Sequence, residues 1–461
     1  MIDLHVVVLA AGKGTRMKSA RAKVLHQVVG YSLIEHVFRT ADALTPTSVT
    51  VIVGHQADQV QAASAKRTGL RFAVQSPQLG TGHALLQAEP LLTGATGTLV
   101  LLSGDVPLLR PETLRALIAT HQEQRAAATV LTAAVDRPHG YGRIVREAGG
   151  ISAIVEHKDA TDAQKEIREI NSGIYAFDVA PLFGALKQIG SANAQGEYYL
   201  PDLVTIYRAR GLAVETVIAS DAREILGVNS PKELADAGAV LKMRKNEALM
   251  DAGVTIVDPS SAFIGPDVTI GADTIIHPGV YLEGRTSIGS NCVINSGVRI
   301  VDSRIEDGVV INNFCVITES HISPGAKVGP FAHIRPQSSV GENAHVGNFV
   351  ELKKTALGAG SKANHLSYLG DATIGAGVNV GAGTITCNYD GTFKHPTVIG
   401  DGAFIGSDSQ LIAPVRVGKG AYVAAGSSIT EDVPDDALAI ARGRQVNKNG
   451  WVSRKKKHET R

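Results

Sequence analysis

Aliphatic side chains return at every sixth position through the second half of the chain. The first run has seven members in one phase, and each of the next two runs begins after a one-residue slip. A six-residue period predicts a parallel β-helix, in which each unit supplies one strand and one turn and three units close a triangular coil. The repeated positions are Ile264, Ile270, Ile276, Leu282, Ile288, Ile294 and Ile300; Ile305, Ile311 and Ile317; Ile322, Val328, Ile334, Val340, Val346 and Leu352; and Ile399, Ile405, Leu411, Val417, Val423 and Ile429.

The six-residue rhythm stops between about Lys353 and Ile374. We expect the segment KKTALGAGSKANHLSYLGD to leave the regular coil there, and an interruption in so regular a solenoid is where we expect a functional site. His365 lies inside this segment. A neutral imidazole near pH 7 suits a general base, which makes this histidine a candidate.

The first half of the chain alternates strand and helix patterns. The apolar runs VVVLA, SVTVIVG and TLVLLSGD are separated by helical stretches such as Leu33–Leu44 and Pro111–Gln124. This alternation predicts an α/β domain with a Rossmann-like, mostly parallel sheet. We predict three parts: the α/β domain over residues 1–229, a linker helix over 230–250, and the β-helix over 251–461 with a solvated, frayed basic tail, RKKKHETR.

Two candidate chemical motifs stand at the ends of these apolar runs. A loop with Gly12 and Gly14 follows VVVLA and leads to Arg16 and Lys23, while Asp105 ends TLVLLSGD. The loop matches neither the Walker pattern nor the dinucleotide fingerprint, so it fits a triphosphate or else a solvated basic turn. Asp105 fits a Mg²⁺ ligand beside phosphates or else an ordinary turn residue. Ligands bind such sheets at the carboxyl ends of the strands, where both motifs lie.

Composition narrows the class of protein. The chain has 461 residues, 44% of them hydrophobic, which is enough for two or three domains with ample cores. A net charge of +1 favours neither nucleic acid nor an anionic membrane surface, and no run of about 20 apolar residues predicts a membrane span. The N-terminus lacks a secretory leader pattern, so we expect a cytoplasmic protein.

The three cysteines are too few and too scattered for a disulfide framework or a zinc cluster. Cys292 and Cys315 each stand four residues after a repeat aliphatic, where small residues such as Val268 and Ala344 also occur. We therefore expect both to be small, inward-facing residues of the β-helix core.

More selective motifs occur in both halves of the chain. The first half carries LAAGKGTRM, QLGTGHA, LSGDVPL, GYGRIVRE, VEHKDAT, EINSGIY and NAQGEYYLPDL, and the second carries VGNFVELKK, NHLSYLGDATIGAGVNVGAGTITCNYDG and IGSDSQLIAPV. From about residue 5 to about residue 445 the chain resembles the bacterial bifunctional N-acetylglucosamine-1-phosphate uridylyltransferase/glucosamine-1-phosphate acetyltransferase family. The resemblance implies a left-handed β-helix, a homotrimer, and a role in synthesis of UDP-N-acetylglucosamine, a cell-wall precursor.

In the first domain the resemblance implies a site for UTP and N-acetylglucosamine 1-phosphate. Arg16 and Lys23 would offset charge as pyrophosphate leaves, and Asp105 and Asn229 would hold Mg²⁺. Ser103 stands where many relatives have Tyr, so its contact with the sugar departs from the family pattern. The other implied contacts are Leu9, Ala10, Ala11 and Gly12 in the phosphate loop, Gln75, Gln78, Gly80 and Thr81 on the uracil side, and Gly142, Glu156 and Asn171 on the sugar side.

In the second domain the resemblance implies an earlier step, acetylation of glucosamine 1-phosphate by acetyl-coenzyme A. His365 would take a proton from the substrate amine, and Glu351 would orient His365. The implied sugar-phosphate contacts are Arg335, Lys353, Tyr368, Asn379 and Lys394, and the implied acetyl-coenzyme A and oxyanion contacts are Ala382, Asn388, Tyr389, Ser407, Ala425 and Arg442.

Two other interpretations concern the whole chain. It could be a single-activity sugar-nucleotide pyrophosphorylase whose β-helix is structural or regulatory, which the presence of His365, Lys353 and Arg442 opposes. It could also be a non-enzymatic subunit of the nucleotide-exchange type, which the loop before Lys23 and the carboxylate of Asp105 oppose.

A third alternative is a hexapeptide carbonic anhydrase, whose zinc needs three converging histidines. His321, His333 and His345 recur at intervals of twelve residues, which is two hexapeptides. Successive histidines would therefore stand on different faces of the coil, and we expect them not to converge.

Overall fold

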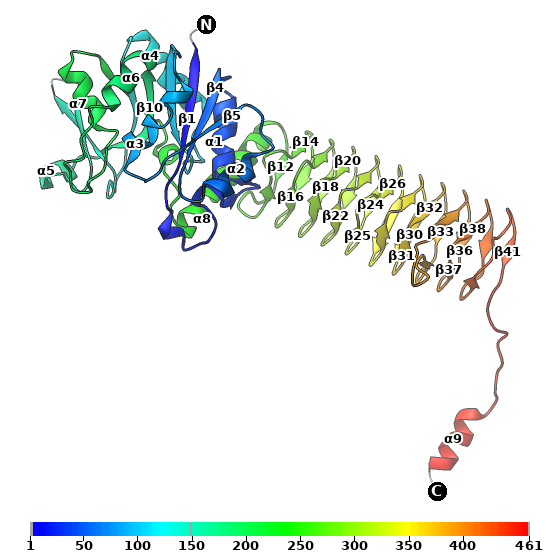
Figure 1. The fold of residues 1–461 in the computed structure, drawn as a ribbon. Helices are drawn as coiled ribbons and strands as arrows, with labels where there is room; N and C mark the ends of the chain where they lie inside the picture. Colours follow the sequence, from blue (N-terminus) through cyan, green and yellow to red (C-terminus); the bar gives the residue numbers. More distant parts are fainter. Residues whose placement is uncertain (1–2, 148–149, 460–461) are drawn as a thin grey trace. The chain divides into compact units, whose positions relative to one another are not determined.

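The computed structural model describes residues 3–147 and 150–459 (Figure 1). The chain divides into two compact units, Met1–Leu241 and Lys242–Arg461. The division falls inside α8 (Pro231–Asp251), a helix at the position where the sequence predicts a linker helix.

The first unit is built on a nine-stranded sheet. Its main path runs β11-β7-β10-β6-β1-β4-β5, with β8 and β9 attached through β10. The β1, β4, β5 and β6 strands run parallel, whereas β10 is antiparallel to both of its neighbours on the path, so the mostly parallel sheet is confirmed. The strands are β1 (Leu4–Ala10), β4 (Ser48–Val53), β5 (Leu70–Val74), β6 (Thr98–Ser103), β7 (Ala128–Ala134), β8 (Arg143–Glu147), β9 (Gly150–Val155), β10 (Glu169–Asp178) and β11 (Val214–Ile218), with a separate hairpin of β2 (Gln27–Val28) and β3 (Tyr31–Ser32).

Helices cover both faces of this sheet, because successive side chains of a strand point to opposite faces. Val7 of β1 packs in a core with residues of α3, α6 and α7, whereas Val6 and Val8 pack in a second core with residues of α1 and α4. The helices are α1 (Leu33–Asp42), α2 (Ala57–Ser64), α3 (Thr81–Leu86), α4 (Pro111–Glu123), α5 (Asp162–Lys165), α6 (Val179–Leu186) and α7 (Asp202–Ala209), with 3₁₀ turns at Thr15–Met17, Lys23–Leu25, Glu89–Leu91 and Ala222–Ile225.

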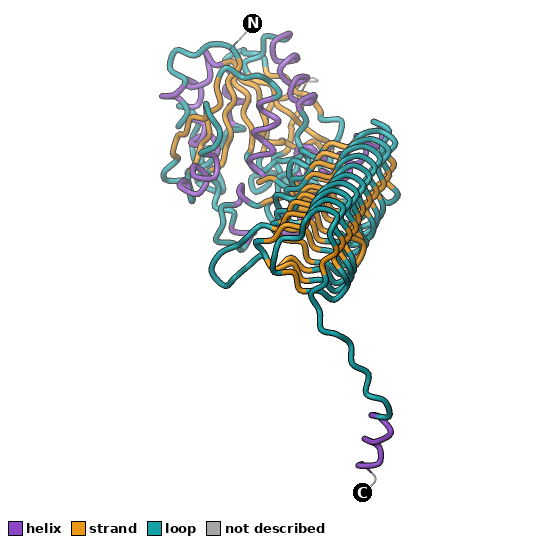
Figure 2. Tube along the Cα trace, turned by 90° about the vertical axis from the view of Figure 1, so that its right-hand side faces the viewer, coloured by secondary structure: helices purple, strands orange, loops and turns teal. Residues whose placement is uncertain are grey.

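The second unit is a left-handed parallel β-helix with three sheets of 11, 10 and 9 strands (Figure 2). The 11-stranded sheet contains β12 (Thr255–Ile256), β15 (Ile275–Ile276), β18 (Val293–Ile294), β21 (Val310–Ile311), β24 (Lys327–Val328), β27 (His345–Asn348), β30 (Lys362–His365), β33 (Asn379–Val380), β36 (Phe404–Ile405), β39 (Tyr422–Val423) and β41 (Leu438–Ala439).

The other two sheets complete each coil. The 10-stranded sheet contains β13 (Phe263–Ile264), β16 (Tyr281–Glu283), β19 (Arg299–Val301), β22 (Val316–Thr318), β25 (His333–Ile334), β28 (Glu351–Lys353), β31 (Tyr368–Gly370), β34 (Ile385–Cys387), β37 (Gln410–Ile412) and β40 (Ser428–Ile429). The 9-stranded sheet contains β14 (Thr269–Ile270), β17 (Ser287–Ile288), β20 (Arg304–Ile305), β23 (His321–Ile322), β26 (Ser339–Val340), β29 (Ala356–Leu357), β32 (Ala372–Ile374), β35 (Thr397–Ile399) and β38 (Val415–Val417).

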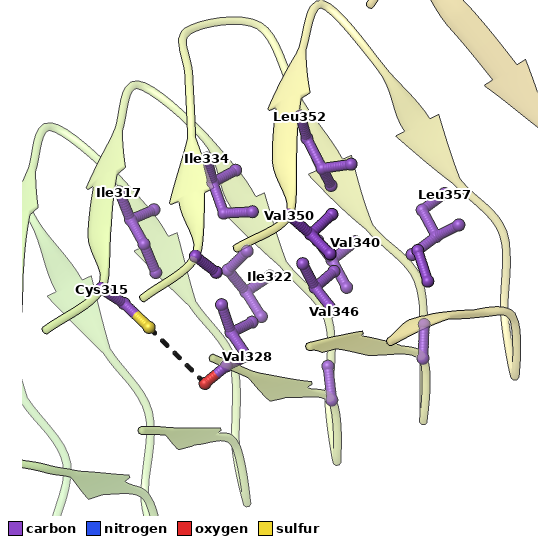
Figure 3. Packing of buried hydrophobic residues seen from close by; sticks show 14 of the residues in the cluster. Cys315, Ile317, Ile322, Val328, Ile334, Val340, Val346, Val350, Leu352 and Leu357 are labelled. Carbon is purple, nitrogen blue, oxygen red and sulfur yellow. Dashed lines mark hydrogen bonds between the residues drawn. The ribbon is translucent and has the colours of Figure 1, made fainter. Parts of the chain in front are cut away.

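The six-residue repeat fills the interior of the coil, as Figure 3 shows for a segment of the stack. All the predicted aliphatic positions are buried except Ile270, which is half-buried against the core. Ile270 ends β14, the first strand of its sheet, so only one neighbouring strand covers it. Cys292 and Cys315 are fully buried in the same core, as predicted, and Cys315 lies 3.8 Å from the carbonyl oxygen of Val328.

The irregular spacings all fall where the chain passes from the 10-stranded to the 9-stranded sheet, here called the 10/9 corner. The repeat shortens to five residues at this corner after Ile300, Ile317, Leu352 and Leu369, and it keeps six residues at the other two corners. The expected departure from the coil over residues 353–371 is therefore wrong. The coil continues through β29 to β32. The six-residue period is hard to recognise there because two five-residue corners follow one another and the core position between them is the small residue Ala363.

The actual insertion lies at residues 388–396, between β34 and β35 at the same 10/9 corner (Figure 1). The coil from Asn379 to its ladder partner Phe404 contains 25 residues, against 18 from Phe263 to Tyr281. Asp390 orders the insertion, because its carboxylate accepts hydrogen bonds from the backbone amides of Thr392 and Phe393 and from His395, which lowers the pKa of Asp390 to about 2.

The C-terminal tail differs from the prediction of a frayed end. Residues 451–459 form α9 (Trp451–Glu459), and its first residues, Trp451 and Val452, are exposed. The last two residues of the predicted tail lie outside the described residues. A run of lysine and arginine has good helix propensity, which the sequence interpretation underrated.

Candidate active sites

Three adjoining cavities open at the carboxyl ends of β1 and β6. The largest, about 440 Å³, is lined by nine of the residues predicted for the nucleotide and metal, Leu9, Ala10, Ala11, Gly12, Gln75, Gln78, Gly80, Thr81 and Asp105, together with Lys23 and the predicted sugar contact Ser103. A Cβ at Gly12 would meet nothing within 4 Å, so its bare backbone faces open space. This loop has the geometry expected for a phosphate-binding loop.

Lys23 reaches across this cavity to the predicted metal ligands. Its ammonium donates to the Asp105 carboxylate and, at 3.0 Å, to the side-chain oxygen of Asn229. Gly14 permits this approach, because a Cβ there would lie 2.6 Å from Cβ of Lys23. Arg16 lines a second cavity of about 320 Å³, which shares Ser103 and Asp105 with the first and also contains Asn229.

Hydrogen bonds within their own segment hold the predicted uracil-side amides, Gln75 and Gln78. Gln75 is buried, and its amide nitrogen donates to the carbonyl oxygen of Gly80 at 2.9 Å. His83 lies 3.2 Å from the same nitrogen, and Gln78 donates to the carbonyl oxygen of Gln75. The sequence interpretation missed His83, although it lies inside the motif QLGTGHA. The segment is thus a hydrogen-bonded frame around the cavity wall.

The third cavity, about 210 Å³, brings together the three residues predicted for the sugar, Gly142, Glu156 and Asn171. A Cβ at Gly142 would stand 3.2 Å from Oε1 of Glu156, so glycine keeps this cavity open. Burial raises the pKa of Glu156, and the acidic neighbours Asp159, Asp202 and Glu197 raise it further. Ser103 lines all three cavities, so they meet at this residue.

In the β-helix, four of the five predicted sugar-phosphate residues, all except Asn379, lie along the 10-stranded sheet and at the 10/9 corner. Lys353 donates to Asp371 at 2.8 Å, and the Asp371 carboxylate also accepts a hydrogen bond from Asn388. The pKa of Lys353 is raised, first by this hydrogen bond, whereas the neighbouring Lys353 lowers the pKa of Lys394. The two ammonium groups are therefore neighbours at this corner, with the Asp371 carboxylate beside them. Asp371 was missed in the sequence.

Glu351 and Tyr368 stand opposite each other on the ladder of the 10-stranded sheet. Glu351 accepts a hydrogen bond from Arg335 at 2.7 Å. It therefore pairs with a predicted sugar-phosphate residue, and in this chain it does not make the expected contact with the catalytic candidate.

His365 pairs with a different residue. Its Nδ1 lies 2.8 Å from the side-chain oxygen of Asn348, which is its ladder partner one coil earlier. The amide oxygen is an acceptor, so Nδ1 carries the proton and Nε2 is left free to act as a base. In this chain the side chain of Asn348 contacts His365, and the side chain of Glu351 contacts Arg335. The 17-residue coil spacing would have pointed to Asn348 had the coil been traced through residues 353–371.

The predicted acetyl-coenzyme A residues divide between two corners. Ala382, Ser407 and Ala425 follow strands of the 11-stranded sheet, at the corner that leads to the 10-stranded sheet, here called the 11/10 corner. Arg442 joins them through a hydrogen bond of 2.7 Å to the carbonyl oxygen of Ala425. Asn388 and Tyr389, by contrast, lie in the insertion at the 10/9 corner, and Asn379 lies on the ladder of the 11-stranded sheet.

Family models match both units. The model for the MobA-like NTP transferase domain matches residues 6–172, and the model for the bacterial transferase hexapeptide, of six repeats, matches residues 267–302, 319–354 and 396–431. The curated relatives named "Bifunctional protein GlmU" include those of Exiguobacterium sp., 53% identical over 98% of this chain and all of the relative, and Brevibacillus brevis, 51% identical over 98% of each. The chain belongs to the GlmU family.

As a GlmU family member, the chain is a bifunctional transferase of UDP-N-acetylglucosamine synthesis. The first unit is a nucleotidyltransferase, and the β-helix is an acetyltransferase. The GlmU relative of Koribacter versatilis is 50% identical over 98% of this chain and 97% of its own length, so the similarity spans both units. The single-activity and non-enzymatic alternatives are not favoured.

The three histidines weighed as zinc ligands do not converge. His321, His333 and His345 belong to β23, β25 and β27, which lie in the 9-, 10- and 11-stranded sheets respectively. This arrangement agrees with the twelve-residue spacing and removes the basis for the carbonic anhydrase interpretation.

Over residues 3–147 and 150–459, the structure contains no helix that is both long enough and apolar enough to cross a membrane.

Proposed function

We propose that the three cavities of the first unit hold UTP and N-acetylglucosamine 1-phosphate. The observation that carries this proposal is that all three cavities meet at Ser103 and that two of them share Asp105, so a glycine-rich loop, a buried amide frame and a small recess surround one point. A phosphate oxygen of the sugar would attack the α-phosphorus of UTP, and the bond to pyrophosphate would break. No protein nucleophile is required, because positioning and charge neutralisation supply the catalysis.

Asp105 and Asn229 fit a Mg²⁺ ion. Their side-chain oxygens already converge on one cation, the ammonium of Lys23, and carboxylate and amide oxygens are the ligands that Mg²⁺ prefers. When bound, the ion would neutralise charge on the nucleotide phosphates. Lys23 would then turn to the phosphates and, with Arg16, offset the charge of the departing pyrophosphate.

In the β-helix we assign His365 as the general base for acetyl transfer. The Nε2 atom left free by Asn348 would take a proton from the amine of glucosamine 1-phosphate as that amine attacks the acetyl carbonyl carbon. The thiolate of coenzyme A would leave. Arg335, Lys353 and Lys394 would bind the sugar phosphate, since they supply the cationic group at the 10/9 corner.

The division of residues between two corners supports a homotrimer with sites between neighbouring chains. His365 precedes the 10-stranded sheet at the 11/10 corner, whereas Lys353 and Asp371 lie at the opposite edge of that sheet. The 11/10 corner also exposes Phe314, Phe331 and Phe349, which stack with centroids 5.3 Å apart. An exposed apolar column of this kind is typical of an interface.

The experiment that tests this proposal is complementation between two inactive variants. Purified protein should first turn over UTP with N-acetylglucosamine 1-phosphate, and acetyl-coenzyme A with glucosamine 1-phosphate. The variants His365→Ala and Lys353→Met should each lose acetyl transfer, and co-expressed chains should recover part of it, because a mixed assembly pairs an intact base with an intact phosphate site. Failure to recover activity in verified mixed trimers would contradict the shared site. We also propose that the protein acts in the cytoplasm, where its substrates are made.

A further inference from the structure

Arg143 is a buried cation that no described function uses. It begins β8, is 1% exposed, and forms no ion pair with any carboxylate in the described parts of the chain. Burial lowers the pKa of Arg143, and Glu156 acts on it only through its charge. Removing a guanidinium from water is costly, so the contacts that hold it there require an explanation.

The guanidinium of Arg143 binds three groups from separate segments. One nitrogen donates to the carbonyl oxygen of Tyr141, and the other lies 3.2 Å from Nδ1 of His157 and 3.4 Å from the carbonyl oxygen of Lys165. Lys165 ends the short helix α5, where a backbone carbonyl lacks an intrahelical partner. Only the planar fork of arginine supplies donors in several fixed directions, so lysine cannot make the same set of bonds.

Two of these groups adjoin opposite walls of the sugar cavity. Tyr141 precedes Gly142, whose carbonyl oxygen accepts from the amide of Asn171 at 2.9 Å, and His157 follows Glu156 directly. Gly142 and Glu156 face each other across a gap that a single Cβ would narrow to 3.2 Å. Arg143 therefore links the two walls from behind and does not line any of the three cavities described above.

His157 can serve this arrangement only as an acceptor. Arginine has no lone pair to offer, so Nδ1 of the imidazole must be unprotonated. Desolvation and then the charges of His139, Arg143 and Lys165 lower the pKa of His157, which agrees with a neutral ring. The neighbouring ring of His139 stands 4.4 Å away, centroid to centroid, and packs edge-on.

We propose that Arg143 and His157 are positioning residues for the sugar phosphate in uridylyl transfer. They set the width of the recess between Gly142 and Glu156 without touching either substrate. This inference rests on the proposed sugar-side assignment of that recess and adds the residues that hold its geometry.

The test compares substrate dependence in matched variants of the full-length enzyme. Arg143→Lys keeps the charge but loses the fork, so the KM for N-acetylglucosamine 1-phosphate should rise about 10-fold or more while the KM for UTP and the acetyl-transfer rate stay unchanged. His157→Leu should produce a similar shift. His157→Asn should restore the wild-type KM, because an asparagine oxygen can replace Nδ1 as the acceptor.

The outcomes separate this inference from the assignment on which it rests. Gly142→Ala narrows the recess directly, so an unchanged KM for the sugar phosphate in that variant would refute the sugar-side assignment itself. If Gly142→Ala raises that KM but Arg143→Lys and His157→Leu do not, the positioning role is overturned alone. Equal increases in KM for both substrates, or failure of His157→Asn to differ from His157→Leu, would show a general structural role and would also overturn it.

Discussion

The nucleotidyltransferase unit and the β-helix gather their functional residues in different ways. In the first unit, loops from positions as far apart as Leu9 and Asn229 meet at one edge of a twisted sheet, so one chain encloses connected cavities. In the β-helix, residues close in sequence such as His365 and Asp371 are sent to opposite edges of a sheet by the coil. The sheet of the first unit brings distant residues together, whereas the solenoid separates residues that are close in sequence, and in the proposed trimer a neighbouring chain would bring them together again.

The largest expected effect is confined to the first unit. Asp105→Ala removes a carboxylate proposed to hold Mg²⁺, whose charge stabilisation is worth several kcal/mol, so uridylyl transfer should fall by about 10³-fold or more. Acetyl transfer should be unchanged in the same preparation. Pyrophosphate release measures uridylyl transfer, and thiol release measures acetyl transfer. Loss of both activities in the same variant would contradict the view that the two sites are independent.

A comparable loss is expected in the β-helix from His365→Ala. Acetyl transfer should fall by about 10²–10⁴-fold, the usual contribution of one positioned acid–base group, with uridylyl transfer unaffected. Asn348→Ala should cause a smaller loss, because it frees the ring without removing the base. Near wild-type acetylation by His365→Ala would instead indicate that the amine loses its proton to water before binding.

A stability effect should distinguish the two units as folding bodies. Ile317→Ala removes fully buried methyl groups from the stacked core, and such substitutions cost about 2–5 kcal/mol. Acetyl transfer should be inactivated at a lower temperature than in the wild type, while the inactivation temperature of uridylyl transfer should not change. Val316→Ala is the matched control, since Val316 is the preceding residue of the same strand and is exposed.

The smallest effect concerns the paired ammonium groups. The charge of Lys353 lowers the pKa of Lys394, so Lys394 loses its proton at a lower pH than an ordinary lysine, and affinity for a phosphate dianion should fall as pH rises through that range. Calorimetry in buffers of different ionisation enthalpy should show proton uptake on binding of glucosamine 1-phosphate. Lys394→Met should weaken binding about 5-fold and abolish the uptake. Proton uptake that persists in Lys394→Met would show that another group takes up the proton.

The periodic parts of the molecule were predictable because each signal is local. The repeated aliphatic residues lie in the core of the β-helix, as predicted. The strands that end at Ala10 and Ser103 were predicted from apolar runs. The errors have physical causes. The five-residue corner after Leu352 mimicked a break in the coil, and the small core residue Ala363 removed the next apolar signal.

Contacts that depend on the three-dimensional course of the chain could not be predicted from the sequence. Asn348 meets His365 only because a ladder joins coils 17 residues apart. The sequence assigned no role to Arg143, because no local pattern reveals that His157 and the carbonyl oxygen of Lys165 contact its guanidinium. Burial of a charge without a carboxylate is a property of the fold and has no local pattern.

The position of the insertion has a consequence for how the β-helix can diversify. Closing a chain segment costs entropy that grows only with the logarithm of its length, so extending a coil from 18 to 25 residues costs about 0.3 kcal/mol. The 10/9 corner is also the place where the coil already tolerates five residues in place of six. The chain can therefore change the length of the segment 388–396 at little cost in folding free energy, which makes this corner a place where the β-helix can accept a new loop.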